Sequence, residues 1–380
     1  MEGPSLHVVG RFPPPLDGQA LATERLASLL EAPDRRVARV NVGAPEGDHV
    51  VTTLQAGRAA HFWRQRRHLR AALAAEPDGP VLWPSVSPST FGHLRDRLVV
   101  VPAFGPSRSV VGVVHRGDFA QLFERTATRA SGIALMQRLA GVVFLTEGLA
   151  DRCAPWIPDA KRLVIPNTID DAAIPGLAEV EAARAERAER LAGPHPEIRL
   201  LYLSGLVPSK GYPDVLDALA VLRGRGADAR ATFAGRWASA EAERSFSART
   251  AALGVSAHVT VAGAVSDRAA VRRLYHSHDL FLLPTAYPIE AQPLTVIEAL
   301  AAGTPVVVTR HAGLPEMVTG GREAEFVGHG APEQIADAAL TLVARWSSAS
   351  QQARSRFDAA FAPDAVRDHW MRLLATLPSK

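Results

Sequence analysis

The sequence predicts an α/β protein of two domains, each built on a parallel β-sheet covered by helices. The chain has 380 residues, a length that suits two domains. Short apolar runs alternate with longer helical patterns throughout, as expected for strands buried on both faces of a parallel sheet. A stretch without any strand pattern, residues 175–196, separates the runs into two sets.

The predicted strands are short runs rich in Val, Leu and Ile. In the first half they cover residues 6–10, 37–42, 81–83, 110–114, 142–145 and 163–165. In the second half they cover residues 199–203, 231–234, 259–261, 280–283, 306–308 and 325–327. The segment 175–196 between them is rich in Ala, Glu and Arg, has high helix propensity and ends in a Pro-containing turn, so the domain boundary is placed there.

Composition narrows the functional class. A formal net charge of +3 is too small to favour a nucleic-acid partner. Cys153 is the single cysteine, and no apolar run reaches the length of a spanning helix, so we expect a cytoplasmic protein. Neither a His-Glu-x-x-His motif nor a Cys/His cluster occurs, so no metal cofactor is expected.

Residues 280–308 form the most informative segment. Its pattern predicts a buried strand, a loop, a short helix, a tight turn and a second buried strand. Glu290 lies in the loop and Glu298 in the helix, eight positions later. Pro293, Leu294 and Thr295 lead into the N-terminus of that helix, where free N–H groups and the helix dipole favour an anion such as a phosphate. The segment therefore predicts a site for a nucleotide diphosphate attached to a group with hydroxyls.

Glu298 also has a purely structural interpretation. Thr295-Val-Ile-Glu298 fits a capping box, in which Thr295 is the N-cap and Glu298 bonds back to its amide. The local pattern alone favours this alternative. Glu290 follows Pro288 in a polar loop after a buried strand and has no comparable structural role, which favours a ligand contact.

Glu290-x7-Glu298, followed by Ala-Leu-Ala-Ala-Gly-Thr-Pro-Val-Val, resembles the signature of retaining glycosyltransferases of the GT-B fold. The specific resemblance is to glycosyltransferase family 4, the glycosyl transferases group 1. Further segments resemble that family in the same order along nearly the whole chain, at residues 12–19, 115–118, 165–170, 204–211 and 312–316.

The resemblance implies two Rossmann-like domains facing each other across a cleft. Residues 1–180 would bind the acceptor and residues 197–355 the nucleotide sugar. Residues 356–380 would cross back to the N-terminal domain, anchored by Phe361 and Trp370, although an ordinary amphipathic packing helix fits them equally well.

The resemblance also assigns the donor site. Lys210 would contact the donor diphosphate, although most lysines in such loops are only solvated. The family usually carries an arginine five residues earlier, where this chain has Gly205, and Arg236 is a candidate substitute by its position after a strand. Gly18, after Asp17 in the first loop, would lie near the diphosphate. His115, at the end of a strand, would lie near the transferred sugar or be structural.

The activity implied is retaining, metal-independent transfer of a sugar from a nucleotide sugar, such as a UDP- or GDP-sugar, to a hydroxyl acceptor. The acceptor class is a polysaccharide, a lipid-linked sugar or a secondary metabolite. A nucleotide-sugar epimerase, a phosphorylase or a non-catalytic partner subunit on the same fold remain alternatives, the last because of Gly205.

A basic helix is predicted from Arg58 to Arg70, with Phe62, Trp63 and Leu69 among its arginines. Such a helix could bind anionic lipid headgroups and bring the protein to a lipid-linked acceptor at the inner face of the membrane. A solvated surface helix is the favoured alternative, because a single helix of this kind is only weakly attracted.

Overall fold

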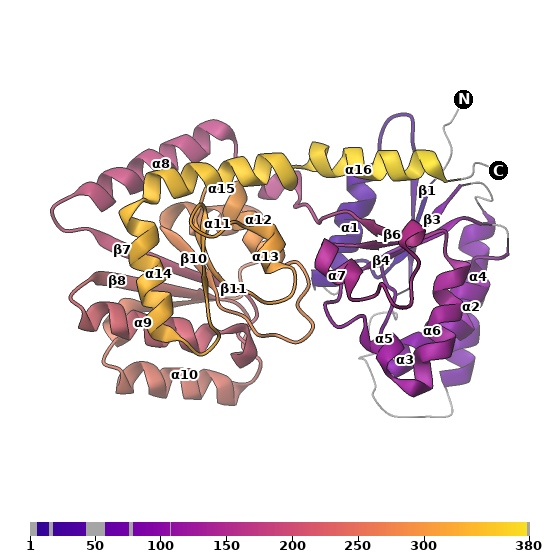
Figure 1. The fold of residues 1–380 in the computed structure, drawn as a ribbon, viewed down its shortest axis with the longest axis horizontal. Coiled ribbons are helices and arrows are strands. Elements are labelled where there is room, and N and C mark those ends of the chain that lie inside the picture. Colours follow the sequence, from indigo (N-terminus) through magenta and orange to yellow (C-terminus); the bar gives the residue numbers. More distant parts are fainter. Residues whose placement is uncertain (1–5, 15–17, 43–57, 76–78, 107, 378–380) are drawn as a thin grey trace. The chain divides into compact units, whose positions relative to one another are not determined.

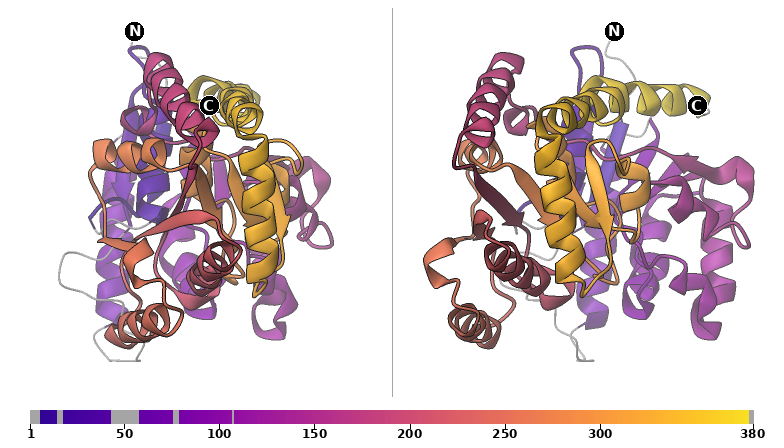
Figure 2. Two further views of the ribbon diagram at one scale, coloured as in Figure 1. Left: turned by 90° about the vertical axis from the view of Figure 1, so that its left-hand side faces the viewer. Right: turned by 60° about the vertical axis from the view of Figure 1, so that its left-hand side comes forward.

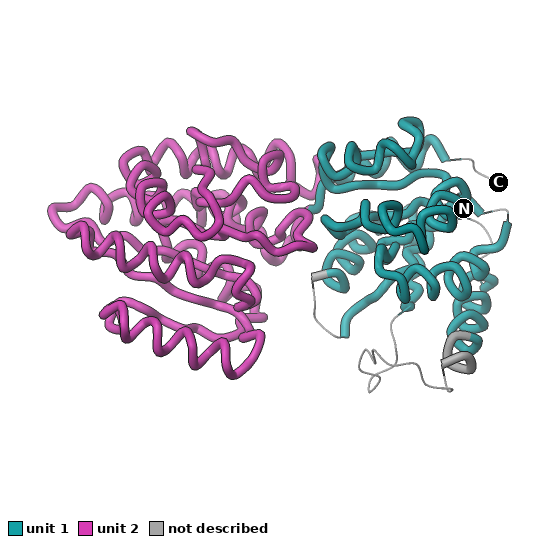
Figure 3. The backbone as a smooth tube through the Cα atoms, turned by 60° about the horizontal axis from the view of Figure 1, so that its bottom comes forward, with its two compact units in different colours: residues 1–167, 366–380 teal, residues 168–365 magenta. Residues whose placement is uncertain are grey.

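The computed structural model describes residues 6–14, 18–42, 58–75, 79–106 and 108–377. The chain divides into two compact units, unit 1 with residues 1–167 and 366–380, and unit 2 with residues 168–365 (Figure 3). Each unit has one six-stranded sheet in which every pair of neighbouring strands is parallel. Helices flank both sheets (Figure 1), which confirms the predicted fold class.

In unit 1 the strand order is β2-β1-β3-β4-β5-β6. The central strands are Val-rich and fully buried, as strands covered on both faces must be. The strands are β1 Leu6–Gly10, β2 Val37–Asn41, β3 Val81–Trp83, β4 Val110–Val114, β5 Gly141–Phe144 and β6 Arg162–Val164. The helices are α1 Gly18–Leu30, α2 Arg58–Ala74, α3 Thr90–Arg95, α4 Val101–Ala103, α5 Gln121–Glu124, α6 Thr126–Arg138 and α7 Glu147–Asp151. A π-helical stretch, Asp96–Val100, joins α3 to α4.

The C-terminal helix α16, Pro363–Thr376, returns the chain to unit 1. Its buried side chains, Val366 and Trp370, pack in one apolar cluster with Leu26 and Leu30 of α1. Phe361, just before this helix, is buried in the core of unit 2 instead. Phe361 is therefore buried in unit 2 and Trp370 in unit 1, at the two ends of the segment that returns the chain to unit 1.

In unit 2 the strand order is β12-β11-β10-β7-β8-β9. The strands are β7 Glu197–Leu203, β8 Asp228–Ala234, β9 Val259–Gly263, β10 Leu280–Leu283, β11 Val306–Thr309 and β12 Ala324–Val327. The helices are α8 Leu177–Ala192, α9 Tyr212–Gly224, α10 Ala240–Ala252, α11 Arg268–Ser277, α12 Leu294–Ala301, α13 Leu314–Met317, α14 Pro332–Ala344 and α15 Trp346–Ala360. One face of the sheet carries α9 and α14, and the other carries α8, α11 and α12 (Figures 1 and 2).

Helix α8 covers most of the segment predicted as the domain boundary, and the structure assigns it to unit 2. Arg187, whose side chain is 1% exposed, is one of the residues that bind α8 to this unit. Its guanidinium donates hydrogen bonds to the carbonyls of Tyr275, His278 and Ala302 and to the hydroxyl of Thr304. Helix α8 has the arginine-rich composition of a solvated linker, yet these hydrogen bonds attach it to the rest of unit 2. The two units divide at Asn167.

Candidate functional site

The predicted site residues of unit 2 lie at the carboxyl edge of its sheet. Strands β7, β8 and β9 follow one another toward one edge of the sheet, and β10, β11 and β12 follow one another toward the opposite edge. The strand order therefore reverses between β7 and β10, which are parallel neighbours. Ligands of open parallel sheets bind at such a reversal, outside the carboxyl ends of the strands. The loop after β7, residues 204–211, and the loop after β10, residues 284–293, both begin there.

The two loops are in direct backbone contact. The amide of Ala286 donates to the carbonyl of Ser209 at 2.8 Å. Gly211 has φ 85°, and a Cβ there would lie 2.4 Å from the carbonyl oxygen of Pro284. Only a glycine fits at that position, so the close approach of the two loops requires Gly211.

This contact brings together Lys210 and Glu290, the central pair of the predicted site. Lys210 Nζ lies 3.1 Å from Glu290 Oε2, and the two side chains are 19% and 10% exposed. The ammonium also lies 4.8 Å from the centre of the Tyr287 ring. The Glu290 oxygen is shielded from solvent and has no aligned hydrogen bond among the described residues, so Lys210 supplies its compensating charge.

Helix α12 begins beside this pair. It starts at Leu294, its N-cap is Pro293, and no side chain caps its first turn. The first-turn amides of Leu294 and Thr295 therefore retain the capacity to bind an anion. The capping-box interpretation is wrong, because Thr295 lies inside the helix rather than at its N-cap.

Glu298 points from α12 toward α11 and is 6% exposed. Its carboxylate lies 3.4 Å from an Arg268 nitrogen and 3.4 Å from the Tyr275 hydroxyl, which donates at 2.9 Å to the carbonyl of Thr295. Burial, with the nearby Glu298 carboxylate, raises the pKa of Tyr275 well above its usual value. Glu298 thus helps to hold α11 against α12, and its contact with a ribose remains a prediction.

Gly205 and Arg236 lie on adjacent loops. Gly205 follows β7, is exposed, and a Cβ there would meet only Val207 Cγ2 at 3.9 Å. Arg236 follows β8, and its carbonyl accepts a hydrogen bond from the amide of Leu206 at 2.9 Å. The predicted substitute is therefore next to the position where the cation is missing.

Gly18 and His115 belong to unit 1. Gly18 opens α1, while Asp17 lies outside the described residues. His115 directly follows β4, and both its ring nitrogens are buried without a partner among the described residues. Burial lowers the pKa of His115 to about 4, so the imidazole is neutral at pH 7. A neutral ring with two unused nitrogens is equipped to exchange hydrogen bonds with a ligand hydroxyl.

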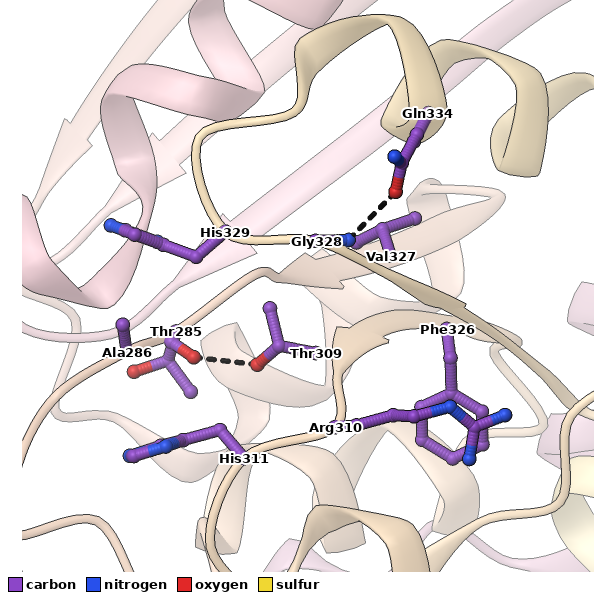
Figure 4. Close-up of a pocket in the computed structure, with 10 residues that line it drawn as sticks. All are labelled: Thr285, Ala286, Thr309, Arg310, His311, Phe326, Val327, Gly328, His329 and Gln334. Carbon is purple, nitrogen blue, oxygen red and sulfur yellow. Dashed lines mark hydrogen bonds between the residues drawn. The ribbon is translucent and has the colours of Figure 1, made fainter.

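A pocket of about 530 Å³ opens beside the Glu290 loop, over the carboxyl ends of β10, β11 and β12 (Figure 4). Sequence reasoning missed its polar lining, which includes Arg310, His311 and His329. The available signal was their position directly after predicted strands. His311 Nε2 lies 2.8 Å from the carbonyl oxygen of Tyr287, which ties the pocket wall to the loop that carries Glu290. Lys210, Glu290 and Glu298 do not line this pocket.

Two further features bear on partners and ligands. No helix in the described part of the chain is both long and apolar enough to cross a bilayer. Within the same residues, no group of three or more His, Cys, Asp and Glu side chains is placed to hold a metal ion.

Comparison with known proteins supports the predicted family. Residues 184–357 match the model of the glycosyl transferases group 1. A GDP-mannose-dependent alpha-(1-6)-phosphatidylinositol dimannoside mannosyltransferase of Mycobacterium tuberculosis is 36% identical over 149 residues, which are 39% of this chain and 36% of that protein. The mannosylfructose-phosphate synthase of Agrobacterium fabrum is 34% identical over 132 residues, 33% of this chain and 28% of that protein. The matches thus span well under half of these relatives.

Solved structures share the fold over nearly the full length. Anabaena Alr3699/HepE, in complex with UDP and glucose, superposes with a TM-score of 0.69 at 17% identity, covering 98% of this chain and 99% of that one. Sucrose-phosphate synthase from Thermosynechococcus elongatus superposes with a TM-score of 0.71 at 17% identity, covering 98% of both chains. The chain therefore has the GT-B fold, and its residues 184–357 match the glycosyl transferases group 1 model.

Proposed function

We propose that this protein transfers a sugar from a nucleotide-sugar donor to a hydroxyl acceptor, with retention of configuration and without a metal ion. The observation that carries the proposal is the Lys210–Glu290 pair beside the uncapped N-terminus of α12, inside the segment that matches the family. An ammonium and a set of helix amides suit a diphosphate, and a carboxylate suits sugar hydroxyls.

Each group has a role in this proposal. Lys210 and the amides of Leu294 and Thr295 hold the diphosphate and stabilise the charge that grows on the leaving phosphate as the glycosidic bond breaks. Glu290 faces the donor sugar, orienting its hydroxyls or stabilising an oxocarbenium-like state. The leaving phosphate then accepts the proton of the acceptor hydroxyl on the same face of the sugar. The predicted contact of His115 with the transferred sugar stays a prediction.

The donor is expected to be a UDP- or GDP-sugar. Among the similar proteins, the mycobacterial relative is GDP-mannose-dependent and HepE binds UDP. Thermal-shift screening against UDP-, GDP-, ADP- and dTDP-sugars tests this: a ligand present at 100 times its Kd adds about 2.7 kcal/mol of stability. No shift with any of these donors would contradict the proposal.

Incubation with the stabilising donor alone separates the rival activities. A transferase leaves the donor largely intact until an acceptor hydroxyl is added. Conversion of the donor to an isomeric sugar without an acceptor would identify an epimerase, and dependence on inorganic phosphate would identify a phosphorylase.

Glu298→Gln tests the ribose contact. The substitution keeps the shape of the side chain and removes its charge, so we expect affinity for UDP or GDP to fall by about tenfold because a charged hydrogen bond to the ribose is lost. Calorimetry with the diphosphate measures this, and thermal unfolding without ligand measures the structural contribution of the Arg268 contact. Equal nucleotide affinity would leave Glu298 with its structural role alone.

We further propose that unit 1 contacts an anionic membrane surface, at the inner face of the cytoplasmic membrane, to reach a lipid-linked acceptor. Helix α2 contains no acidic residue and packs along the stretch that follows α3. Its Trp63 is 61% exposed, Phe91 and Leu94 of α3 are 62% and 45% exposed, and Leu98 of the following π-helical stretch is 54% exposed. Exposed apolar side chains among arginines are the composition that binds anionic lipid interfaces. We call Trp63, Phe91, Leu94 and Leu98, with Arg64 and Arg67, the basic-apolar surface.

Co-sedimentation with vesicles tests this surface. We expect binding to vesicles that contain phosphatidylglycerol, weaker binding at high salt, and about tenfold weaker binding for the double variant Leu94→Ser, Leu98→Ser. Leu177→Ser is the matched control, because Leu177 is 59% exposed but lies in unit 2. Equal binding of both variants would exclude the basic-apolar surface as the contact.

A further inference from the structure

We propose that Arg236 is the second cation of the donor site and binds the phosphates of the nucleotide from the loop after β8. The inference rests on the proposed function. It concerns an exposed side chain whose guanidinium forms no hydrogen bond or ion pair within the described residues.

The first support is backbone position. Strands β7 and β8 are paired in parallel, so the loops at their carboxyl ends are neighbours. The amide of Leu206 donates to the carbonyl of Arg236 at 2.9 Å, and the amide of Ala238 donates to the carbonyl of Leu206 at 3.1 Å. Arg236 therefore emerges directly beside the loop that carries Lys210.

The second support is the closeness of the two loops. Gly235 has φ 152°, and a Cβ there would lie 1.8 Å from the carbonyl oxygen of Ser204 and 3.6 Å from the Cα of Gly205. A side chain at 235 is excluded, while the space over Gly205 is open, because a Cβ there meets only Val207 Cγ2 at 3.9 Å. This open space gives the Arg236 guanidinium a path toward a ligand over the β7 loop.

The third support is the local charge balance. A diphosphate brings more than one negative charge. Lys210 already lies 3.1 Å from Glu290, and Arg268 lies 3.4 Å from Glu298 and 3.1 Å from Asp170. Lys210 is matched by one carboxylate and Arg268 by two, so neither cation has charge left over for a ligand. Binding of a diphosphate therefore requires a further cation.

Two arginines at the carboxyl edge of the unit 2 sheet, Arg236 and Arg310, have no carboxylate partner within the described residues. Arg310 lies after β11, with its guanidinium 4.2 Å from the centre of the Phe326 ring, and β11 is separated from β7 by β10. Arg236 lies after β8, next to β7. Arg236 is thus the unpaired cation closest in the sheet to Lys210, and its planar fork suits phosphate oxygens.

Calorimetry on the full chain tests the inference with two ligands, the preferred nucleoside diphosphate and the matching nucleoside without phosphates. Arg236→Ala should bind the diphosphate about 10-fold more weakly, at the low end for a charged hydrogen bond because the side chain is exposed, and bind the nucleoside unchanged. Arg244→Ala, which removes an exposed arginine of α10, is the matched control and should change neither affinity.

The double variant Arg236→Ala, Gly205→Arg supplies a cation from the adjacent loop and should recover diphosphate affinity to within about threefold of the wild type. Failure to recover would overturn the claim that both positions reach the same phosphates. Unchanged diphosphate affinity in Arg236→Ala, or an equal loss for the nucleoside, would overturn the inference alone. Failure of the wild-type protein to bind any nucleoside diphosphate would overturn the proposed function as well.

Discussion

Replacing Lys210 with alanine is expected to slow sugar transfer by roughly 10- to 150-fold, the equivalent of one charged hydrogen bond lost in the transition state. Two consequences of the substitution add up. The leaving diphosphate loses a cation while its charge is growing, and the buried oxygen of Glu290 loses the ammonium that lies 3.1 Å away. Steady-state kinetics with the donor identified by thermal shift measures the effect. An unchanged rate would remove Lys210 from the mechanism.

A double-variant cycle separates these two consequences. In a Glu290→Gln background the carboxylate charge is absent, so any further loss caused by Lys210→Ala reports on the diphosphate alone. We expect affinity for the nucleoside diphosphate to fall in both backgrounds. A loss confined to the protein that retains Glu290 would mean that Lys210 only neutralises its neighbour.

The strands were the part of the fold most open to prediction from sequence. Strands buried on both faces appear as continuous Val and Leu runs, such as β4 and β11, and every predicted strand overlaps an observed one. Their ends were less predictable: β8 begins at Asp228, three residues before the predicted start, since hydrogen bonds to β7 extend the strand beyond its apolar run.

The individual site residues could also be proposed from sequence, but their contacts could not. Lys210 and Glu290 are 80 positions apart, and they meet only because β7 and β10 are neighbours in the sheet. The capping-box interpretation failed for a similar reason. Thr295-x-x-Glu298 fits that local pattern, yet the helix begins just after Pro293, and Glu298 turns toward Arg268 and away from its own N-terminus.

Helix α8 shows the same limit on a larger scale. Its sequence has the composition of a solvated helix, and nothing local distinguishes Arg187 from the other arginines around it. The difference arises from the ends of α11 and α12, which present carbonyls to this one guanidinium. Four unsatisfied carbonyls are left at the C-terminus of every helix, where a cation is also favoured by the helix dipole.

Replacing Arg187 with alanine is therefore expected to lower the free energy of unfolding of unit 2 by about 3–5 kcal/mol, because several buried acceptors lose their donor at about 1–3 kcal/mol each. The carbonyls of Tyr275, His278 and Ala302 would lose a donor, and the Trp346 ring would lose the guanidinium now 4.9 Å from its centre. Burial lowers the pKa of Arg187 to about 10, so the side chain remains charged at pH 7 and its contacts are charge-assisted.

Urea denaturation of the full chain measures this loss, with Arg184→Ala as the matched control on the same helix. Arg184 is half-buried, and among the described residues its guanidinium donates only to the carbonyl of Ser347, at 3.4 Å in an exposed hydrogen bond, so its removal should cost within about 0.5 kcal/mol. Arg187→Lys should recover part of the stability, because an ammonium restores the charge but cannot span all four acceptors at once. A loss below about 1 kcal/mol for Arg187→Ala would mean that water or a rearranged backbone replaces the guanidinium at the helix ends. It would then follow that α8 is held to unit 2 by its other contacts, such as the ion pair of Arg190 with the buried Asp279 at 2.6 Å.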